Sequence, residues 1–331
     1  MKKTSYKNSS NLENLEELDL DLSINTYEIG SRGGAFDDLK KIEHLVNYIG
    51  FEPNPDECSR LNKKSESSKR FLKERYFQTA IGGIKSRKNL YVTYQPGCSS
   101  FLKPNKKLLS FYGRESWFKV VGEIQADTIT LKNFCLSEHQ PSPDFLKIDI
   151  EGMELEVIEG MDYLLDEVIG IRLEVNYLNH RIQQPRFGEI MSALEKRGFR
   201  VFQFLENHSW RPDSLMGDQY PAKSLIKFSK GALAHGDVLL FRCPASVTED
   251  ANFSKQRLVK MILLLGAYGF VSDAKALLDS QKLARHRIIV RGEVLDSSWI
   301  KSSAKYYLSS SIFTYFKNKF LFIKTFIKAA L

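Results

Sequence analysis

The stretch DFLKIDIEGMELEVIEG, residues 144–160, begins as an apolar strand and ends as an amphipathic helix. Two acids, Asp149 and Glu151, stand one residue apart at the junction. Side chains at positions i and i+2 of a strand point the same way, so both carboxylates can face one side. In an open parallel sheet, ligands bind beyond the carboxyl ends of the strands. The junction is therefore predicted to border an active site.

Strand-like and helix-like runs alternate between about residue 25 and residue 243. The strand-like runs cover residues 24–30, 46–54, 75–83, 144–152, 168–176 and 199–207, and residues 236–244 read as a late, antiparallel strand. Helix-like runs cover residues 37–45, 55–64, 153–167 and 186–198. Alternation of this kind predicts an α/β fold with a doubly wound, mostly parallel sheet.

The sequence divides into three parts. Residues 1–22 are polar and predicted to be flexible, residues 23–245 form the α/β domain, and residues 252–331 form a basic extension that begins with two helices. Ten Lys and Arg against two acids between residues 281 and 331 account for the whole net charge of +8. The α/β domain is thus about neutral, which argues against a nucleic-acid groove in it.

Cysteine usage and hydropathy indicate a cytoplasmic protein. The four cysteines are far apart and form no CxxC pair, as is typical of reduced thiols. The N-terminal residues lack the apolar core of a signal peptide, and no run of about 18 uncharged apolar residues predicts a transmembrane helix.

Three strand ends carry residues suited to an adenosyl ligand. The run NTYEIGSRGG, residues 25–34, ends in a glycine turn that allows close approach of a ligand to the backbone. Glu52 follows the second strand, where a carboxylate can accept both ribose hydroxyls, and Ala80 and Ile81 provide a small apolar wall for an adenine. Because the diphosphate fingerprint GxGxxG is absent, S-adenosylmethionine is favoured over NAD.

Four segments together resemble the FkbM family of S-adenosylmethionine-dependent methyltransferases. They are YEIGSRGG (residues 27–34), IGFEPNPDECSRL (49–61), PGCSSFLKPN (96–105) and PDFLKIDIEGMELEVIEG (143–160). The resemblance implies a Rossmann-like class I methyltransferase sheet of seven strands, the last antiparallel. It also implies O-methylation of a saccharide or polyketide-like hydroxyl. By position, it implies that Glu28, Gly30 and Gly33 form the methionine-side turn, that Glu52 holds the ribose, and that Ala80 and Ile81 flank the adenine.

The two acids after the fourth strand have three interpretations. Asp149 can orient the acceptor hydroxyl or accept its proton, with support from Glu151. Alternatively, Asp149, Glu151 and Glu174 can hold a divalent cation such as Mg²⁺ that lowers the pKa of that hydroxyl. In the third interpretation Glu151 caps the following helix.

A methyl transfer also needs a base for the departing proton. His180, just beyond the fifth strand, is the first candidate and His208 the second. Lys147 lies two residues before Asp149 and is interpreted as a partner for a nearby acid.

The C-terminus has an amphipathic pattern. Aromatic and aliphatic residues recur at helical spacing, with lysines along their flank: Phe313, Phe316, Phe320, Ile323 and Ile327, with Lys317, Lys324 and Lys328. Such a helix can rest on an anionic membrane surface, or dock on its own domain or on a second subunit. The sequence thus predicts a small-molecule, glycan or lipid-linked acceptor, with peripheral membrane contact and a homo-oligomer left open.

The sequence is also compatible with two other functions. A nicotinamide-dependent oxidoreductase fits the α/β alternation and Glu52. A catalytically inactive Rossmann scaffold recruited by its basic tail is the second alternative.

Overall fold

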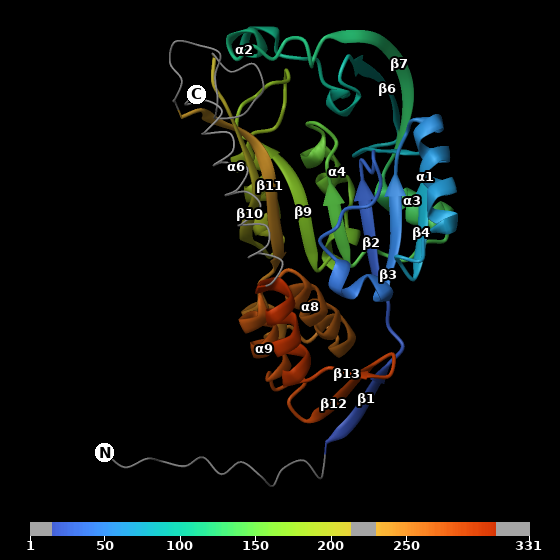
Figure 1. Cartoon of the computed structure of the whole chain (residues 1–331), viewed down its shortest axis with the longest axis vertical. Coiled ribbons are helices and arrows are strands. Elements are labelled where there is room, and N and C mark those ends of the chain that lie inside the picture. The colour runs from blue at the N-terminus through green and yellow to red at the C-terminus, as the bar shows by residue number, and fades with distance from the viewer. Residues whose placement is uncertain (1–14, 213–229, 309–331) are drawn as a thin grey trace, which may run out of the picture. The chain divides into compact units, whose positions relative to one another are not determined.

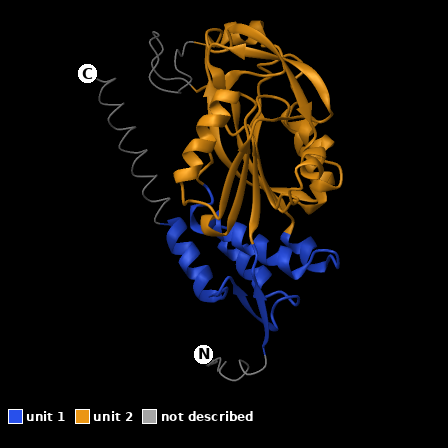
Figure 2. Cartoon of the chain, turned by 90° about the vertical axis from the view of Figure 1, so that its right-hand side faces the viewer, with its two compact units in different colours: residues 1–22, 38–42, 244–311 blue, residues 23–37, 43–243, 312–331 orange. Residues whose placement is uncertain are grey.

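A computed structural model describes residues 15–212 and 230–308 of the chain (Figure 1). Its contacts divide the chain into two compact units (Figure 2). Of the described residues, the larger unit holds residues 23–37 and 43–243, and the smaller one holds the N-terminal strand, residues 38–42 and residues 244–308. The division at residues 243 and 244 coincides with the change in composition seen in the sequence.

A seven-stranded sheet forms the centre of the larger unit. Its strands, in chain order, are β2 (Ile24–Ile29), β3 (Val46–Phe51), β4 (Lys73–Phe77), β8 (Phe145–Ile148), β9 (Gly170–Asn176), β10 (Phe199–Trp210) and β11 (Ala232–Arg242). Their spatial order is β10-β11-β9-β8-β2-β3-β4. Strand β11 pairs antiparallel with both β9 and β10, whereas the remaining pairs are parallel. This confirms the class I methyltransferase sheet with its last strand antiparallel.

Alternate residues of the central strands build the core on one face of this sheet. Ile29, Ile148 and Leu173 are almost completely buried and belong to a single hydrophobic cluster. Helices α3 (Leu131–Ser137), α4 (Glu154–Gly160), α5 (Leu164–Glu167) and α6 (Phe187–Lys196) cover that face, and each contributes buried side chains to the cluster. Helix α1 (Pro55–Ser67) follows β3 and contacts β4; it begins where the Asn54 side chain accepts a hydrogen bond from the Glu57 N–H.

The predicted strand over residues 75–83 is interrupted. Strand β4 ends at Phe77, and β5 (Ala80–Ile81) joins a second sheet with β7 (Val120–Ile129) and β6 (Ser86–Thr93), in the order β5-β7-β6. The chain then approaches α4 so closely that a Cβ added at Gly83 would lie 2.4 Å from the Glu156 carbonyl oxygen. This close packing against α4 turns the chain away from the central sheet. The strand propensity of the sequence does not encode such a contact.

Two predicted helices are shorter than expected. The run over residues 153–167 divides into α4 and α5, because a Cβ at Gly160 would lie 2.4 Å from the Gly83 carbonyl oxygen and Asp162 has a positive φ of 55°. The run over residues 37–45 forms only a 3₁₀ turn, η1 (Lys40–Leu45). The loop between β6 and β7 adds η2 (Pro96–Cys98) and α2 (Lys106–Phe111).

The smaller unit combines helices with a three-stranded sheet. Helices α7 (Pro244–Glu249), α8 (Lys255–Ala267) and α9 (Val271–Leu278) are followed by β12 (His286–Val290) and β13 (Glu293–Val294). The sheet also includes β1 (Glu16–Leu20), which pairs parallel with β12. The prediction of a flexible segment over residues 1–22 is therefore wrong for β1, because a partner more than 260 residues away supplies its hydrogen bonds. Helices α8 and α9 confirm the two predicted there.

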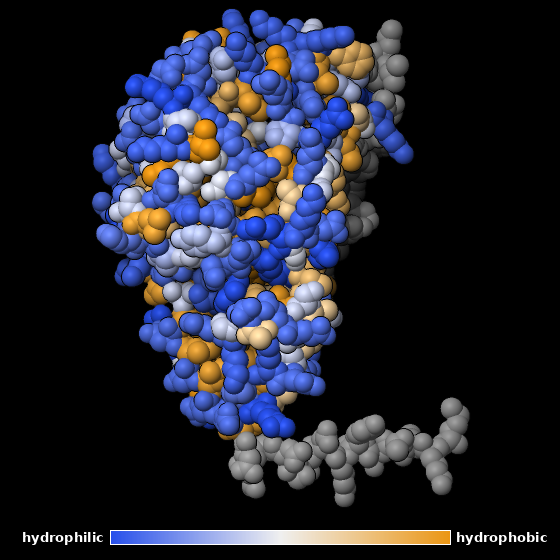
Figure 3. Space-filling view, turned by 180° about the vertical axis from the view of Figure 1, so that it is seen from behind, coloured by the Kyte–Doolittle hydropathy of each residue, from blue (hydrophilic) through white to orange (hydrophobic). Residues whose placement is uncertain are grey.

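Hydrophilic residues dominate the surface seen in Figure 3, with hydrophobic ones in small groups between them. Among the residues that the structure describes, no helix is long and apolar enough to cross a membrane. The predicted amphipathic helix over residues 313–328 lies outside the described residues.

Candidate active site

The turn after β2 brings two strand ends together. Gly30 has a φ of +88°, which a residue with a side chain rarely adopts. A Cβ at this position would lie 1.9 Å from the Asp149 carbonyl oxygen, and the Asp149 N–H donates to the Ile29 carbonyl at 3.0 Å. Only glycine therefore allows the ends of β2 and β8 to meet.

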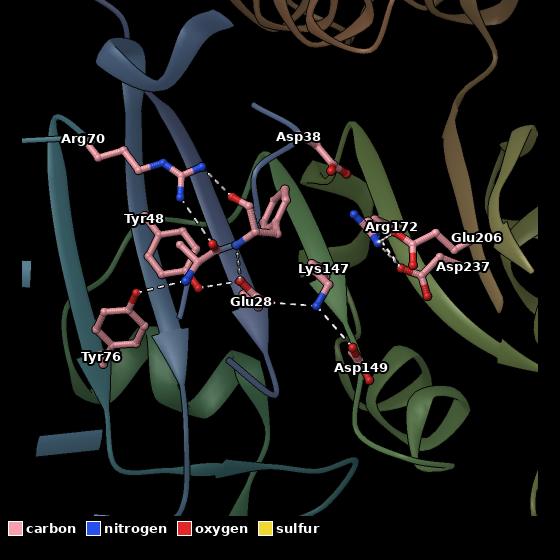
Figure 4. Close-up of polar contacts among 12 residues, drawn as sticks. Glu28, Asp38, Tyr48, Arg70, Tyr76, Lys147, Asp149, Arg172, Glu206 and Asp237 are labelled. Carbon is pink, nitrogen blue, oxygen red and sulfur yellow. Dashed lines mark hydrogen bonds and ion pairs between the residues drawn. The ribbon is translucent and has the colours of Figure 1, made fainter. Parts of the chain in front are cut away.

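Glu28 is held by three donors inside the sheet (Figure 4). Its carboxylate accepts hydrogen bonds from the Tyr48 hydroxyl at 2.6 Å, from the Lys147 ammonium at 2.8 Å and from the Phe36 N–H at 3.2 Å. Burial raises the pKa of Glu28, and the charge of Lys147 opposes that shift. The position of Glu28 fits an acid that stabilises the turn after β2 from within the protein.

Lys147 connects this acid to Asp149 (Figure 4). Its ammonium lies 3.2 Å from an Asp149 carboxylate oxygen, and the Asp149 side chain is 38% exposed. Burial by itself lowers the pKa of Lys147, but the carboxylates of Glu28 and Asp149 raise it well above its ordinary value. The interpretation of Lys147 as the partner of a nearby acid is confirmed.

The ends of β2 and β3 form a second group of acids around Gly33. The Gly33 N–H donates to Glu57 at 3.0 Å, and a Cβ at Gly33 would meet no atom within 4 Å. Glu52 follows β3, is buried, and accepts a hydrogen bond from the Asn54 N–H at 2.8 Å. Burial raises the pKa of Glu52, and the Asn54 N–H and the charge of Arg32 oppose the shift. Arg32 thus lies within electrostatic reach of Glu52.

Ala80 and Ile81 are both buried in β5. Ile81 belongs to the same hydrophobic cluster as Ile29 and Phe51, the last residues of β2 and β3. The apolar wall predicted from the sequence is therefore at the same edge as Gly30 and Glu52, although it belongs to the second sheet.

Glu151 forms a buried ion pair with a residue that the sequence did not single out. The Arg181 guanidinium donates to Glu151 and, at 2.8 Å, to the Cys98 carbonyl, and its side chain is fully buried. Glu151 has a φ of +62°, a strained conformation for a residue other than glycine. Burial raises the pKa of Glu151, and Arg181 opposes the shift.

Glu151 does not cap the following helix, so that interpretation is wrong. Glu154 instead accepts hydrogen bonds from the Ile150 N–H at 3.2 Å and the Gly152 N–H at 3.0 Å. The left-handed backbone of Glu151 directs its side chain to Arg181. The Glu154 carboxylate, not that of Glu151, is the acceptor for the N–H groups of this turn.

The PGCSSF loop is attached to this ion pair. The Ser100 hydroxyl donates to the Glu151 carbonyl at 2.8 Å, and Arg181 donates to the Cys98 carbonyl. Burial, followed by the charge of Glu151, raises the pKa of the Cys98 thiol to about 12, so the thiol stays protonated. These contacts anchor the loop to the junction between β8 and α4.

The predicted cation site of Asp149, Glu151 and Glu174 does not form. Within residues 15–212 and 230–308, no three His, Cys, Asp or Glu side chains come together in a way that can hold a metal ion. Each of the three carboxylates has a partner of its own: Lys147 for Asp149, Arg181 for Glu151 and His235 for Glu174. These separate contacts hold the carboxylates apart.

Three histidines lie beside Trp210 at the same edge of the sheet. His180 is buried, with its ring centroid 5.3 Å from that of Phe118 and 5.4 Å from that of Trp210. Burial, Arg181 and His235 lower the pKa of His180 well below its ordinary value. His208 instead stacks on His235, with ring centroids 4.6 Å apart.

Buried polar atoms without hydrogen-bond partners gather in and after β9. Such atoms are costly to a folded protein and often mark a place where a ligand binds. They belong to Glu174, Asn176, His180, Arg181 and Gln184.

A family model described as the methyltransferase FkbM domain matches residues 31–201, just over half of the chain. The chain belongs to this family. The matched FkbM domain includes the Gly33 turn, Glu52, the β8–α4 junction and Arg181, but it ends before His208 and His235. Family membership and the sheet topology together remove the support for a nicotinamide oxidoreductase.

A curated relative and two solved structures resemble the chain. Hexuronic acid methyltransferase AglP of Haloferax volcanii is 26% identical over 132 residues, which cover 40% of this chain and 48% of that protein. The chain thus matches about half the length of this relative. Methyltransferase FkbM from Methylobacillus flagellatus KT covers 69% of this chain and 45% of its own, with 10% identity and a TM-score of 0.35. The match to precorrin-6y C5,15-methyltransferase from Geobacter metallireducens covers 67% of this chain and 82% of that protein, with 11% identity and a TM-score of 0.30.

Sequence reasoning missed three residues of the site: Tyr48, Arg181 and His235. Tyr48 reads as an ordinary apolar strand residue, and only the neighbouring strand shows that its hydroxyl meets Glu28. Arg181 directly follows His180, so the NHR triplet was a signal that a charged residue accompanies the histidine. His235 precedes the predicted late strand by one residue and carried no local signal.

Proposed function

We propose that this protein is an S-adenosylmethionine-dependent methyltransferase that methylates a hydroxyl group of a saccharide. Membership of the FkbM family supports the methyl donor. The observation that carries the proposal is the buried Glu52 carboxylate at the end of β3, beside the open turn at Gly33. The name of the hexuronic acid methyltransferase relative supports a sugar as acceptor.

The residues after β2, β3 and β4 fit the methyl donor. The space above Gly33 can admit a ligand, and the Glu52 carboxylate can accept hydrogen bonds from ribose hydroxyls in addition to that from Asn54. Gly30 shapes the turn that would face the methionine part, and Glu28 stabilises it from inside. Ala80 and Ile81 would flank the adenine. When bound, S-adenosylmethionine supplies a methyl group on a positively charged sulfur.

The residues after β8 and β9 would receive the sugar. Asp149, partly exposed and held by Lys147, would orient the sugar by accepting a hydrogen bond from one of its hydroxyl groups. Glu151 would act indirectly, because its pairing with Arg181 fixes the loop at residues 96–100 over the site. Correct orientation and exclusion of water provide much of the rate of such a transfer.

Isothermal titration with S-adenosylmethionine and S-adenosylhomocysteine tests the donor site. Loss of charged hydrogen bonds in Glu52→Gln should weaken binding of both ligands about 10–100-fold. Glu66→Gln is the matched control. Glu66 is exposed on α1, the helix that follows Glu52, and this variant should bind like the wild type. Equal affinities for all three proteins would contradict the assignment of Glu52.

Tritium transfer from labelled S-adenosylmethionine tests the acceptor. Methyl β-D-glucuronide and methyl β-D-glucoside serve as probes, and the labelled product is treated with alkali. A methyl ether on a hydroxyl survives this treatment, whereas a methyl ester on the uronic carboxyl is hydrolysed. Alkali-stable label is expected, and a fully labile label would contradict a hydroxyl acceptor.

A further inference from the structure

His235 lies at the edge of the sheet where the acceptor would bind. Because β11 is antiparallel, its early residues meet the ends of the parallel strands. His235 is in register with Asn176 near the end of β9 and with His208 on β10. Its imidazole is thus placed at the edge that also carries Asp149 and Glu174.

The ring of His235 is held in one orientation by its neighbours. Its Nδ1 lies 3.3 Å from Oε1 of Glu174, and its face stacks on His208 with an angle of 18° between the rings. The Trp210 ring meets its edge at a centroid distance of 5.9 Å. A carboxylate that faces Nδ1 selects the tautomer with the proton on that atom, so Nε2 is left as a hydrogen-bond acceptor.

Exposure separates His235 from the base predicted from the sequence. The His235 side chain is 28% exposed, whereas His180 is only 2% exposed and enclosed by Phe118 and Trp210. A general base must come within hydrogen-bonding distance of the proton that it removes. His235 satisfies this condition better than His180. Its Nδ1 faces the Glu174 carboxylate, whereas Nδ1 of His180 is buried without a hydrogen-bond partner.

Burial, more than neighbouring charge, keeps the His235 ring neutral. Burial and His208 lower the pKa of His235 to about 4, and Asp149 opposes the shift. Burial raises the pKa of Glu174 well above its ordinary value, and four nearby carboxylates add to this effect: Glu151, Asp149, Glu154 and Asp237. Arg181 and His180 are the other ionisable groups beside the histidines. The Glu174 carboxylate is the acidic group that lies against Nδ1 of His235, at 3.3 Å.

We propose that His235 is the general base of the reaction, with Glu174 as the residue that positions it. This inference rests on the proposed function. As the acceptor oxygen bonds to the methyl carbon, its proton moves to Nε2 of His235. The carbon–sulfur bond breaks with its electron pair left on sulfur, which yields S-adenosylhomocysteine. Glu174 stabilises the resulting imidazolium through Nδ1.

Kinetics of His235→Ala test the proton transfer. General base catalysis contributes about 100-fold or more, so kcat on the uronide probe should fall by at least that factor while affinity for S-adenosylmethionine stays unchanged. Added imidazole should restore part of kcat, because it replaces the missing base. His44→Ala, at an exposed position of η1, is the control and should behave like the wild type. Unchanged kcat in His235→Ala, or a loss that imidazole does not restore, would overturn the proposal.

The pH profile of Glu174→Gln separates positioning from a structural role. Glu174 must be ionised to accept a hydrogen bond from Nδ1 of His235, so loss of the Glu174 proton should contribute to the acid limb of the wild-type profile. Without this carboxyl group the limb should move to lower pH and the maximal kcat should fall. A limb that stays in place would contradict the pairing.

Nitrogen NMR of the imidazole gives a result that does not depend on the acceptor. At pH 9 the wild type should carry the His235 proton on Nδ1, and Glu174→Gln should lose this preference. A proton on Nε2 in the wild type would overturn the inference even if methyl transfer is observed. If neither sugar is methylated, the saccharide proposal fails. The position of the proton, on Nδ1 or on Nε2, still tests whether Glu174 orients His235.

Discussion

The two edges of the proposed site are stabilised in opposite ways. At the donor edge, after β2 and β3, Glu28 has three protein donors and Glu57 is paired with Arg60 at 2.7 Å. At the acceptor edge, in and after β9, five side chains carry buried polar atoms that lack partners. At the donor edge, Ser31 in the turn after β2 also carries such an atom, so the donor edge is more fully satisfied within the protein than the acceptor edge, but not completely.

Two acids, Glu57 after β3 and Glu154 after β8, differ in protonation. Hydrogen bonding to Arg60 lowers the pKa of Glu57 to about 2, while burial raises the pKa of Glu154 to about 7. Glu57 is paired with an exposed arginine, whereas Glu154 is enclosed in the β8–α4 turn. Water access and pairing, more than residue type, decide how each of these acids responds to pH.

The largest effect is expected from breaking the ion pair of the acceptor edge. Arg181→Met leaves Glu151 as a buried charge without its partner, so the free energy of unfolding should fall by about 3–5 kcal/mol. Arg60→Met at the donor edge removes an arginine that is 52% exposed and should cost less than about 1 kcal/mol. Urea unfolding at pH 7.5 measures both, and equal losses would contradict the contrast.

A second prediction concerns the pH dependence of stability. Between the ordinary pKa of a glutamate and the value of about 7 for Glu154, the folded state binds one more proton than the unfolded state. Stability should therefore fall as the pH rises through this window, by about 3 kcal/mol in total.

Glu154→Gln should make this slope smaller, as urea midpoints between pH 4.5 and 7.5 can show, while other buried acids with raised pKa values retain their share of it. Glu57→Gln provides the comparison at the donor edge. Since the pKa of Glu57 is lowered, its contribution is lost only as the pH falls below the ordinary glutamate value toward about 2. A Glu154→Gln protein with the wild-type slope would exclude Glu154 as its source.

The smallest effect is expected from Asn176→Leu. The Oδ1 atom of Asn176 is buried without a hydrogen-bond partner, so an apolar side chain of similar size should raise the free energy of unfolding by up to about 1 kcal/mol. Tyr48→Phe at the donor edge should instead lower it by about 1.5–3 kcal/mol, because the hydroxyl donates to a buried carboxylate. Thermal and urea unfolding measure the two changes, and a clear loss of stability in Asn176→Leu would contradict an unsatisfied acceptor edge.

The amino-acid sequence by itself determined the sheet, the glycine turn and the acids at the strand ends. These features depend on local periods, since alternation within a strand and a glycine at a turn are read from adjacent residues. Gly30, Glu52, Asp149 and the pairing of Lys147 with an acid were predictable for this reason.

Tertiary structure alone decided which groups meet. Glu174 contacts His235 across 61 positions of sequence and Arg181 contacts Glu151 across 30, because strand order and the antiparallel register of β11 bring them together. Burial then sets which carboxylates keep their protons, and the separate partner of each acid removed the predicted cation site. Neither strand order nor desolvation is encoded in a local pattern, so the contacts of Arg181 and His235 could not be predicted from the sequence, whereas the positions of Glu52 and Asp149 at strand ends could.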